Sequence, residues 1–231
     1  MTSDSDASLE GMHLLQNVPA ADVRALEKAC AWRQYDAGEQ IIDRQSDSRE
    51  VFFVVSGRVR IAIYSIQGRE ITLDDLMPGD HFGELAAIDS EPRSASVMAV
   101  TPCMLASLSA DRFLKLCADQ PDVALRLMRW LSHIVRQATD RIMDLSTLAA
   151  NNRVHAEILR QAKLNMVDDD RAEISPIPVH SDIASRVSTT RETVARVMND
   201  LARDGIVERQ KKVLVVHNVE TLEDMVEDVR G

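Results

Sequence analysis

The feature that most constrains this chain is a long helical segment near its middle. No proline or glycine occurs between Asp122 and Asn151, and a helix of that length would extend roughly 40 Å at about 1.5 Å per residue. Apolar residues recur along it at three- and four-residue steps. We expect a second copy of the chain to cover one face of this helix, and the chain's own domain to cover another. The stripe consists of Leu127, Leu131, Ile134, Ala138, Ile142, Leu145 and Ala149.

The segments on either side of this helix have different patterns. Between Ile41 and Leu108 short apolar runs with period two alternate with turn sequences, which predicts an antiparallel β-barrel or sandwich-like domain. Residues 18–31 predict a short amphipathic helix before it. Asn151-Asn152 mark the expected domain junction, and a further helix is predicted at 154–164. The predicted strands are 41–42, 51–55, 59–64, 71–73, 96–100 and 104–108.

Residues 180–216 carry the clearest functional pattern. Helices are predicted at 180–187 and 191–204, with a Ser-Thr-Thr turn between them and Gly205 where a helix end favours the left-handed conformation. A β-hairpin over 206–216 follows. Two helices joined by a tight turn and followed by such a wing form a winged helix-turn-helix, which is a DNA-binding module.

The start of the second helix holds Arg191, Glu192 and Arg196. In such modules this end faces base edges in the major groove, where Arg can bind guanine O6 and N7 together and Glu can accept from cytosine N4. Glu192 and Arg196 are also four residues apart, so the alternative is a surface ion pair worth about 0.2–0.5 kcal/mol. Phosphate contacts are predicted for His180, Ser181 (near the N-cap of the first helix), Thr190, Thr193 and Lys211.

The net charge of −10 is unusual for a protein that binds DNA. The charge is uneven along the chain, however. Residues 180–212 contain seven Lys or Arg and five Asp or Glu, which leaves a local charge of +2. Because local charge governs attraction to a phosphate backbone, the acidic remainder does not exclude a DNA-binding surface.

Other classes of protein find little support in the sequence. Cys30, Cys103 and Cys117 are widely spaced and predict buried reduced thiols rather than a metal or iron–sulfur site. We find no nucleophile–base set and no phosphate-cradling glycine-rich loop, so we expect no enzymatic activity. No segment approaches the roughly 20 apolar residues of a membrane helix, and no signal-peptide pattern is present. We therefore expect a cytoplasmic protein without a membrane partner.

A second motif, Phe82-Gly83-Glu84-Leu85 followed by Arg93-Ser94-Ala95, predicts an effector site. Gly83 permits close backbone approach, and the segment after it can form a short helix whose N-terminal amides favour an anion. Arg93 supplies a fork of donors and Ser94 a hydroxyl, while the Glu84 carboxylate suits a sugar hydroxyl. Together these groups indicate a cyclic-nucleotide site. The alternative is that the Gly-Glu sequence forms a turn and the arginine an ion pair, without a ligand.

The FGEL…RSA pattern before the long helix and the TTRETVARV pattern after it together resemble the cyclic-AMP receptor (catabolite activator)/fumarate-nitrate regulator superfamily. The similarity extends from about Leu14 to Val216. It implies an α+β fold with an N-terminal antiparallel β-roll (a cyclic-nucleotide-binding jelly roll), a long dimerisation helix and a C-terminal winged helix-turn-helix. The expected boundaries are 1–120, 121–150 and 151–231.

The resemblance also implies roles for individual residues and partners. It implies a homodimer formed through residues 124–149, cAMP as allosteric effector, and double-stranded DNA and RNA polymerase as partners. It implies that Arg191, Glu192 and Arg196 read a palindrome with TGTGA-like half-sites. The nucleotide site it implies consists of Gly83, Glu84, Arg93 and Ser94, and we extend it to Leu85, Thr139, Ile61 and Leu73.

Two departures bear on the effector. The spacer between Glu84 and Arg93 is one residue shorter than in the best-known cyclic-AMP receptor. The hydroxyl pair that touches adenine there aligns with Ala138-Thr139 here, so one polar contact is lost; cAMP is favoured, and cGMP remains possible. The cysteine cluster of the redox branch is absent. The haem branch would need a ligand such as His81, which we instead expect to be a solvent-facing turn histidine.

Our hypothesis for the mechanism couples two sites. Nucleotide bound in the β-roll reaches the long helix near Thr139, stabilises one helix register beyond Asp140 and reorients both helix-turn-helix modules. The second hypothesis is a regulator with the same fold whose DNA binding is independent of an effector or responds to another small molecule. An alternative of another class is a nucleotide-binding module that regulates a protein partner.

Overall fold

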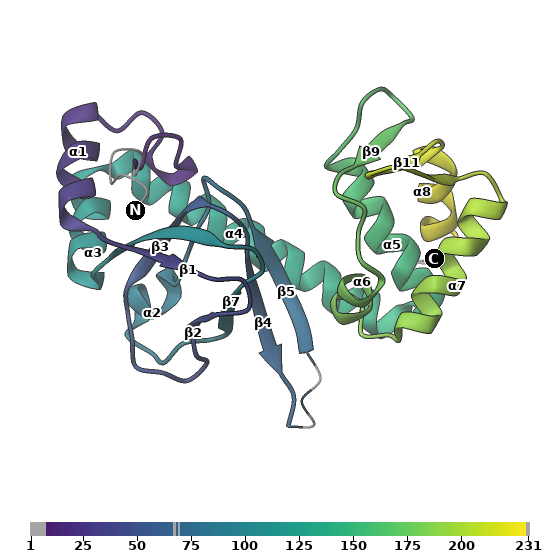
Figure 1. Cartoon of the computed structure of the whole chain (residues 1–231), viewed down its shortest axis with the longest axis horizontal. Coiled ribbons are helices and arrows are strands. Elements are labelled where there is room, and N and C mark those ends of the chain that lie inside the picture. The colour runs from purple at the N-terminus through teal and green to yellow at the C-terminus, as the bar shows by residue number, and fades with distance from the viewer. Residues whose placement is uncertain (1–7, 67, 69, 230–231) are drawn as a thin grey trace. The chain divides into compact units, whose positions relative to one another are not determined.

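The computed structural model describes residues 8–66, 68 and 70–229. The chain divides into two compact units, Met1–Ile134 and Val135–Gly231. The predicted α+β class is confirmed: the first unit is built on antiparallel sheets, and the second is mainly helical with a small sheet (Figure 1). No helix among the described residues is long and apolar enough to cross a membrane.

The first unit contains two four-stranded antiparallel sheets. One has the order β1 (Ala31–Tyr35), β8 (Cys103–Leu108), β3 (Val51–Ser56), β6 (His81–Phe82), and the other β2 (Gln40–Ile42), β7 (Ser96–Ala99), β4 (Val59–Tyr64), β5 (Glu70–Leu76). All six predicted strands are present. The sequence did not suggest β1, which has one fully buried side chain, or β6, which has only two residues.

Strand β3 lies at the centre of this unit because both of its faces are buried. Successive side chains of a strand point to opposite faces, and those of β3 enter two different cores. Phe52 and Val54 pack between the two sheets, where Phe52 stacks on Phe82 at 5.0 Å between ring centroids. Val51 and Phe53 pack against helices. These helices are α1 (Ala20–Ala29), α3 (Ala110–Asp119) and the start of α4 (Pro121–Thr147), with a short turn η1 (His13–Leu15) beside them.

The long helix α4 changes its surroundings along its length. Leu127 is buried in the helical core of the first unit, and Leu131 packs against it. Further along the helix, Val135 and Ile142 are 64% and 63% exposed in the single chain. The chain's own domain therefore covers only the first half of the predicted apolar stripe.

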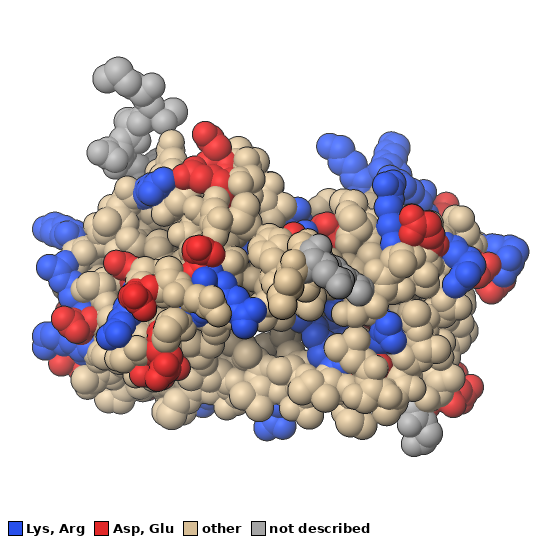
Figure 2. All heavy atoms as spheres, turned by 90° about the horizontal axis from the view of Figure 1, so that it is seen from below, with Lys and Arg blue, Asp and Glu red and all other residues tan. Residues whose placement is uncertain are grey.

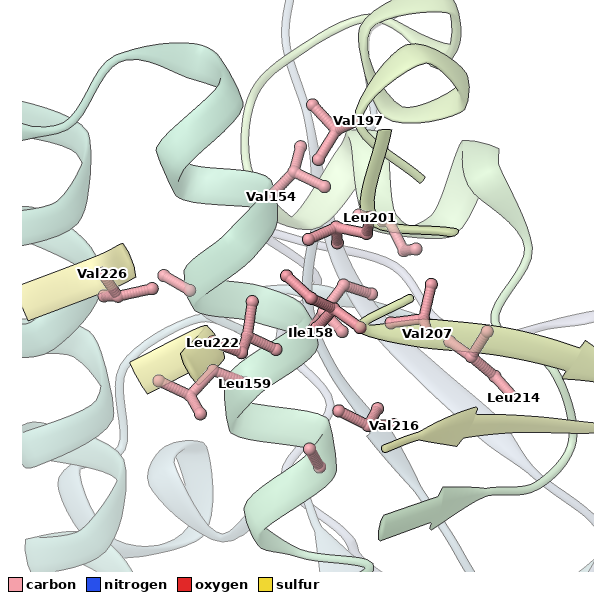
Figure 3. Close-up of a cluster of buried hydrophobic side chains, with 14 of the residues drawn as sticks. Val154, Ile158, Leu159, Val197, Leu201, Val207, Leu214, Val216, Leu222 and Val226 are labelled. Atoms are coloured by element: carbon pink, nitrogen blue, oxygen red, sulfur yellow. The ribbon is translucent and has the colours of Figure 1, made fainter. Parts of the chain in front are cut away.

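The second unit surrounds helix α5 with an apolar core (Figure 3). Side chains from α5, α7, the wing strands and the last helix meet there, among them Ile158, Leu201, Leu214 and Leu222. Its elements are α5 (Ala150–Lys163), β9 (Ala172–Ile174), α6 (His180–Arg186), α7 (Arg191–Arg203), β10 (Val207–Gln210), β11 (Val213–Val216) and α8 (Val219–Glu227).

One expectation for this unit needs correction, and two of its elements were not predicted. Asn151 and Asn152 do not mark a break, because they lie in the first turn of α5; the helices separate at Leu148-Ala149 instead. The sequence analysis did not predict α8, because the acidic residues of this segment obscure the apolar pattern of the buried Leu222 and Val226. It also missed β9, which pairs with β11 and extends the hairpin to a three-stranded sheet.

Arg153 ties the break after α4 to the turn of the helix-turn-helix. Its Nη1 donates to the carbonyl of Leu148 at 2.9 Å, its Nε to Val187 at 2.8 Å and its Nη2 to Ser188 at 3.1 Å. Ser188 has a φ of +51°, a conformation that costs energy for a residue with a Cβ. The carbonyls at the end of a helix and in a tight turn lack partners within their own segment, and here one guanidinium supplies the missing donors.

We expect Arg153→Met to lower the free energy of unfolding of the second unit by about 2 kcal/mol, because charged hydrogen bonds to three carbonyls are lost. Urea unfolding followed by hydrogen exchange of α6 and α7 amides measures this. Arg203→Met is the control, since the Arg203 side chain is 70% exposed and forms ion pairs with Asp200 and Asp204 at the surface. Equal stability of the two variants would contradict the role given to Arg153.

Candidate effector site and nucleic-acid interface

Gly83 forms the corner from which the short helix α2 (Glu84–Asp89) leaves strand β6. Its φ is +87°, which L-residues rarely adopt. A Cβ at this position would also lie 2.7 Å from Nη1 of Arg93 and 2.8 Å from the carbonyl oxygen of Glu50. Glycine is therefore required twice, for the backbone angle and for the close approach of Arg93. The short helix predicted after Gly83 is confirmed.

Arg93 is 3% exposed, and each nitrogen of its guanidinium donates a hydrogen bond to the protein. It donates to Oγ of Ser48 at 3.0 Å, to the carbonyl of Gly83 at 2.8 Å and to the carbonyl of Glu50 at 2.8 Å. Burial lowers the pKa of Arg93, and the carboxylates of Glu50 and Glu84 oppose this shift. An anion that binds here meets a rigidly oriented cation, and it has to share or replace these acceptors.

Glu84 is 4% exposed and lies close enough to Arg93 for their charges to interact. Burial raises the pKa of its carboxyl group, whereas its own backbone amide, the indole N–H of Trp130 and the charge of Arg93 lower it. Trp130 on α4 therefore lies near the Glu84 carboxyl group. Sequence reasoning missed Trp130, because nothing in the spacing pairs position 84 with position 130; the only available signal was a tryptophan on the helix that follows the motif.

The other predicted effector residues have varied surroundings. Leu85 and Ser94 are exposed, on α2 and beside Arg93. Ile61 on β4 and Leu73 on β5 are half-buried. Leu73 is the extra residue of a β-bulge, since Ile61 pairs with Asp74 while the next residue of β4 pairs with Thr72. Thr139 belongs to the second unit, where its hydroxyl donates to the carbonyl of Val135 at 3.0 Å.

The expectation of a solvent-facing His81 is wrong. His81 lies in β6, is 5% exposed, and its ring centroid is 5.6 Å from that of Trp130. Burial lowers the pKa of its imidazole to about 4, so the ring is neutral at pH 7. Among the residues the structure describes, no cluster of three or more His, Cys, Asp or Glu side chains is arranged to hold a metal ion.

The helix-turn-helix has the predicted elements. Thr190 is the N-cap of α7, and its Oγ1 accepts from the backbone amide of Thr193 at 3.2 Å. Val194, Val197 and Leu201 on the opposite face of α7 are buried. Helix α6 begins at His180 after the N-cap Val179, so Ser181 lies near the N-cap, exposed in the first turn of the helix.

Arg191, Glu192 and Arg196 are all exposed on α7. Arg196 donates from Nη2 to Oδ1 of Asn151 at 3.0 Å. The α7 amide and the Thr190 hydroxyl lower the pKa of Glu192. These contacts replace the ion pair between Glu192 and Arg196 that the sequence left as an alternative. Asn151, read from the sequence as a junction residue, instead orients a predicted base-reading arginine.

Basic groups from three elements converge beside α7. Burial, then the charges of Arg191 and Arg209, lower the pKa of His180, so α6, α7 and β10 bring these groups together. Lys211 is exposed at the tip of the hairpin, with a φ of +46°. In Figure 2 Lys and Arg side chains project from the upper and outer edges of the half that holds this unit. This concentration of cations can attract a phosphate backbone.

A winged helix-turn-helix with an exposed basic recognition helix, in a chain that also holds a β-roll with a buried Arg–Glu pair, defines a ligand-responsive DNA-binding regulator. Residues 32–120 match the cyclic nucleotide-binding domain family, and residues 125–225 match the Crp-like helix-turn-helix domain family. The chain belongs to the cyclic-AMP receptor/fumarate-nitrate regulator family of transcription regulators, which are not enzymes.

Relatives across the chain support this assignment. It is 32% identical over 195 residues to the cyclic AMP receptor protein of Thermus thermophilus, covering 84% of this chain and 87% of that protein. It is 25% identical over 218 residues to the CRP-like cAMP-activated global transcriptional regulator of Mycobacterium tuberculosis, covering 94% and 97%. A CooA variant from Carboxydothermus hydrogenoformans has the same fold, with a TM-score of 0.78 at 21% identity over 87% of this chain and 90% of CooA.

We expect Arg191→Met to raise the pKa of His180, because removing a neighbouring cation makes protonation of the imidazole less costly. NMR titration of the six histidines measures this shift. Arg203→Met, at the other end of the same helix, should leave the His180 titration unchanged. An unchanged pKa of His180 in the Arg191→Met variant would show that Arg191 and His180 do not lie close together.

Proposed function

We propose that this protein is a cAMP-responsive transcription regulator that binds as a homodimer to a DNA palindrome with TGTGA-like half-sites. The observation that carries the proposal is the grouping of Gly83, Glu84 and Arg93 at the start of α2, inside the domain that matches the cyclic nucleotide-binding family. A buried cation beside a buried carboxylate suits a ligand that has both a phosphate and a sugar hydroxyl.

In this proposal Arg93 binds the cyclic phosphate and Glu84 the ribose hydroxyl, with Ser94 adding a hydroxyl and Leu85, Ile61 and Leu73 apolar contacts. Thr139 supplies one polar contact to the base, so cAMP is the preferred effector and cGMP a weaker one. Several relatives carry names that include cAMP, which supports the choice of nucleotide. No metal, haem or iron–sulfur cluster takes part.

Dimer formation in this proposal uses α4. Exposed apolar residues of the helix, among them Val135, Ile142 and Met143, form the face that a second copy covers, within residues 124–149. We take 1–120 as the effector domain, 121–150 as the dimerisation helix and 151–231 as the DNA-binding domain of a cytoplasmic protein. The effector stabilises the state in which two α7 helices lie roughly 34 Å apart, one turn of DNA.

Contacts to DNA divide into two groups in this proposal. Arg191, Glu192 and Arg196 read base edges, whereas His180, Ser181, Thr190, Thr193 and Lys211 bind phosphates and set the position of the module. RNA polymerase is the proposed protein partner at the promoter. A regulator of a protein partner alone would have no need for arginines exposed at the start of α7.

A second candidate is a regulator whose DNA binding is independent of an effector or responds to a different small molecule. The observation in its favour is that three carbonyl or hydroxyl oxygens of the protein already accept hydrogen bonds from Arg93. In that case Arg93 and Glu84 stabilise the β-roll, and nucleotide has no effect on DNA binding.

We expect Arg191→Ala and Arg196→Ala each to weaken binding to a TGTGA palindrome by about 10- to 100-fold, because each removes a bidentate contact worth about 1–3 kcal/mol. Fluorescence anisotropy with labelled operator at fixed salt measures this. Arg203→Ala removes an equal charge from the far end of α7 and should change affinity less than threefold. Equal losses in all three variants would indicate general electrostatic attraction without base reading.

We expect purified protein to bind cAMP more tightly than cGMP, and cAMP to strengthen operator binding. Isothermal titration calorimetry with both nucleotides, followed by operator titration with and without them, tests both points. Glu84→Gln should weaken cAMP binding about tenfold, since a neutral amide replaces a charged acceptor; Glu91→Gln, in the exposed loop before Arg93, is its control. Nucleotide binding with unchanged operator affinity would favour the second candidate.

A further inference from the structure

The loop between β2 and β3, residues 43–50, has no role in the function proposed so far, although it is bound to the segment that contains Arg93. The amide of Arg93 donates to the carbonyl of Ser46 at 3.1 Å. The amide of Gln45 donates to the carbonyl of Arg93 at 3.0 Å. These paired backbone hydrogen bonds give the loop a defined position beside the effector site.

Two serine hydroxyls of this loop form a chain that ends at the guanidinium of Arg93. Nε of Arg93 donates to Oγ of Ser48 at 3.0 Å. Oγ of Ser46 donates to the carbonyl of Asp43 at 2.8 Å, and the two serine hydroxyls lie 3.2 Å apart. A hydroxyl has only one hydrogen, and that of Ser46 is given to Asp43. Ser48 is therefore the donor to Ser46, and its hydrogen points away from the arginine.

Ser48 is the acceptor of Arg93 that a ligand can replace most easily. The other two acceptors are the backbone carbonyls of Gly83 and Glu50, which move only with the corner before α2 and with the start of β3. Ser48 is exposed, and rotation about its χ1 angle moves the hydroxyl without changing the backbone. Because Nε carries a single hydrogen, it becomes available to a ligand only when Ser48 releases it.

The acceptor at Nε is uncharged, in contrast to the surroundings of Nη2. The carboxylate of Glu50 lies 3.6 Å from Nη2, whereas Nε donates to a neutral hydroxyl. A phosphate oxygen at Nε would replace a neutral acceptor with a charged one, and hydrogen bonds to charged acceptors are stronger. A phosphate also offers further oxygens, to which the displaced hydroxyl of Ser48 can donate.

We propose that Ser48 is a further phosphate-binding residue of the effector site: a phosphate oxygen takes the place of its hydroxyl at Nε of Arg93, and the hydroxyl turns from Ser46 to donate to the phosphate. This inference rests on the proposed binding of a cyclic nucleotide at Arg93. Two neutral-acceptor hydrogen bonds of the free protein are exchanged for two bonds to a charged acceptor, which favours the bound state. The ligand class is a phosphate ester with two free oxygens on phosphorus.

The two phosphorothioate analogues of cAMP test this contact at single atoms. In each analogue sulfur replaces one of the two exocyclic oxygens on phosphorus, and sulfur is a weak acceptor. By isothermal titration calorimetry we expect Ser48→Ala to weaken cAMP binding about 5- to 10-fold: water can replace the exposed hydroxyl in the free protein, but a hydrogen bond to a charged group is lost in the complex. For one of the two analogues the same substitution should change affinity less than about twofold, because its sulfur already removes the contact.

Ser46→Ala is the matched control for this experiment. It removes the neighbouring hydroxyl of the same loop, which the proposal does not place on the ligand. We expect it to leave the affinities for cAMP and for both analogues within about twofold of those of the unmodified protein.

A second variant separates a binding role from a structural one. Ser48→Asp keeps an acceptor at Nε of Arg93 and makes it charged, so the Tm should stay the same or rise. The same carboxylate occupies Nε and repels a phosphate, so cAMP binding should weaken about 50-fold or more. A serine with a structural role alone would lose stability and binding together.

The outcomes separate this inference from the proposed function. If Ser48→Ala leaves cAMP affinity unchanged, or weakens cAMP and both analogues by the same factor, Ser48 does not contact the phosphate and the proposed function stands. Undiminished cAMP binding by the Ser48→Asp variant would also overturn the inference alone. Absence of cAMP binding to the unmodified full-length protein would overturn both.

Discussion

In each functional region of the chain, one arginine side chain donates hydrogen bonds to oxygens of an irregular backbone segment and stabilises its shape. Arg93 and Arg153 each bind three oxygen acceptors. In the first unit the acceptors include the carbonyl of Gly83, so the corner that begins α2 is held against the cation. In the second unit they belong to the break after α4 and to the turn before α7. In both cases an irregular backbone segment keeps its shape because one side chain satisfies its carbonyls.

The two sites differ in how accessible their polar groups are to a ligand. Arg191, Glu192 and Arg196 are exposed, and the contacts of Arg196 with Asn151 and of Glu192 with Thr190 lie at the surface; duplex DNA can replace such contacts with its own. Arg93 and Glu84 are almost fully buried, and protein oxygens already accept hydrogen bonds from the Arg93 guanidinium. A ligand must therefore compete with internal hydrogen bonds, and that competition links its binding to a change in conformation.

Much of the fold was predictable because local patterns determine it. All six predicted strands, α1, α4 and both helices of the helix-turn-helix followed from periodicity and turn residues. The misses have physical causes. Strand β6 is too short to show a period, and α8 hides its apolar face among acidic residues. His81 follows a turn sequence that usually faces solvent, but the packing of α4 over β6 buries it.

The sequence by itself determined most of the longer elements, their order and the two glycine-dependent corners, Gly83 and Gly205, because backbone preferences and hydrophobic period act over a few residues. It also placed the functional residue types in their motifs. Only the tertiary structure decided which distant groups those residues meet: Trp130 at Glu84, Asn151 at Arg196, and Val187 and Ser188 at Arg153. These pairings join residues more than 30 positions apart, and they depend on how whole elements pack, which no local pattern encodes.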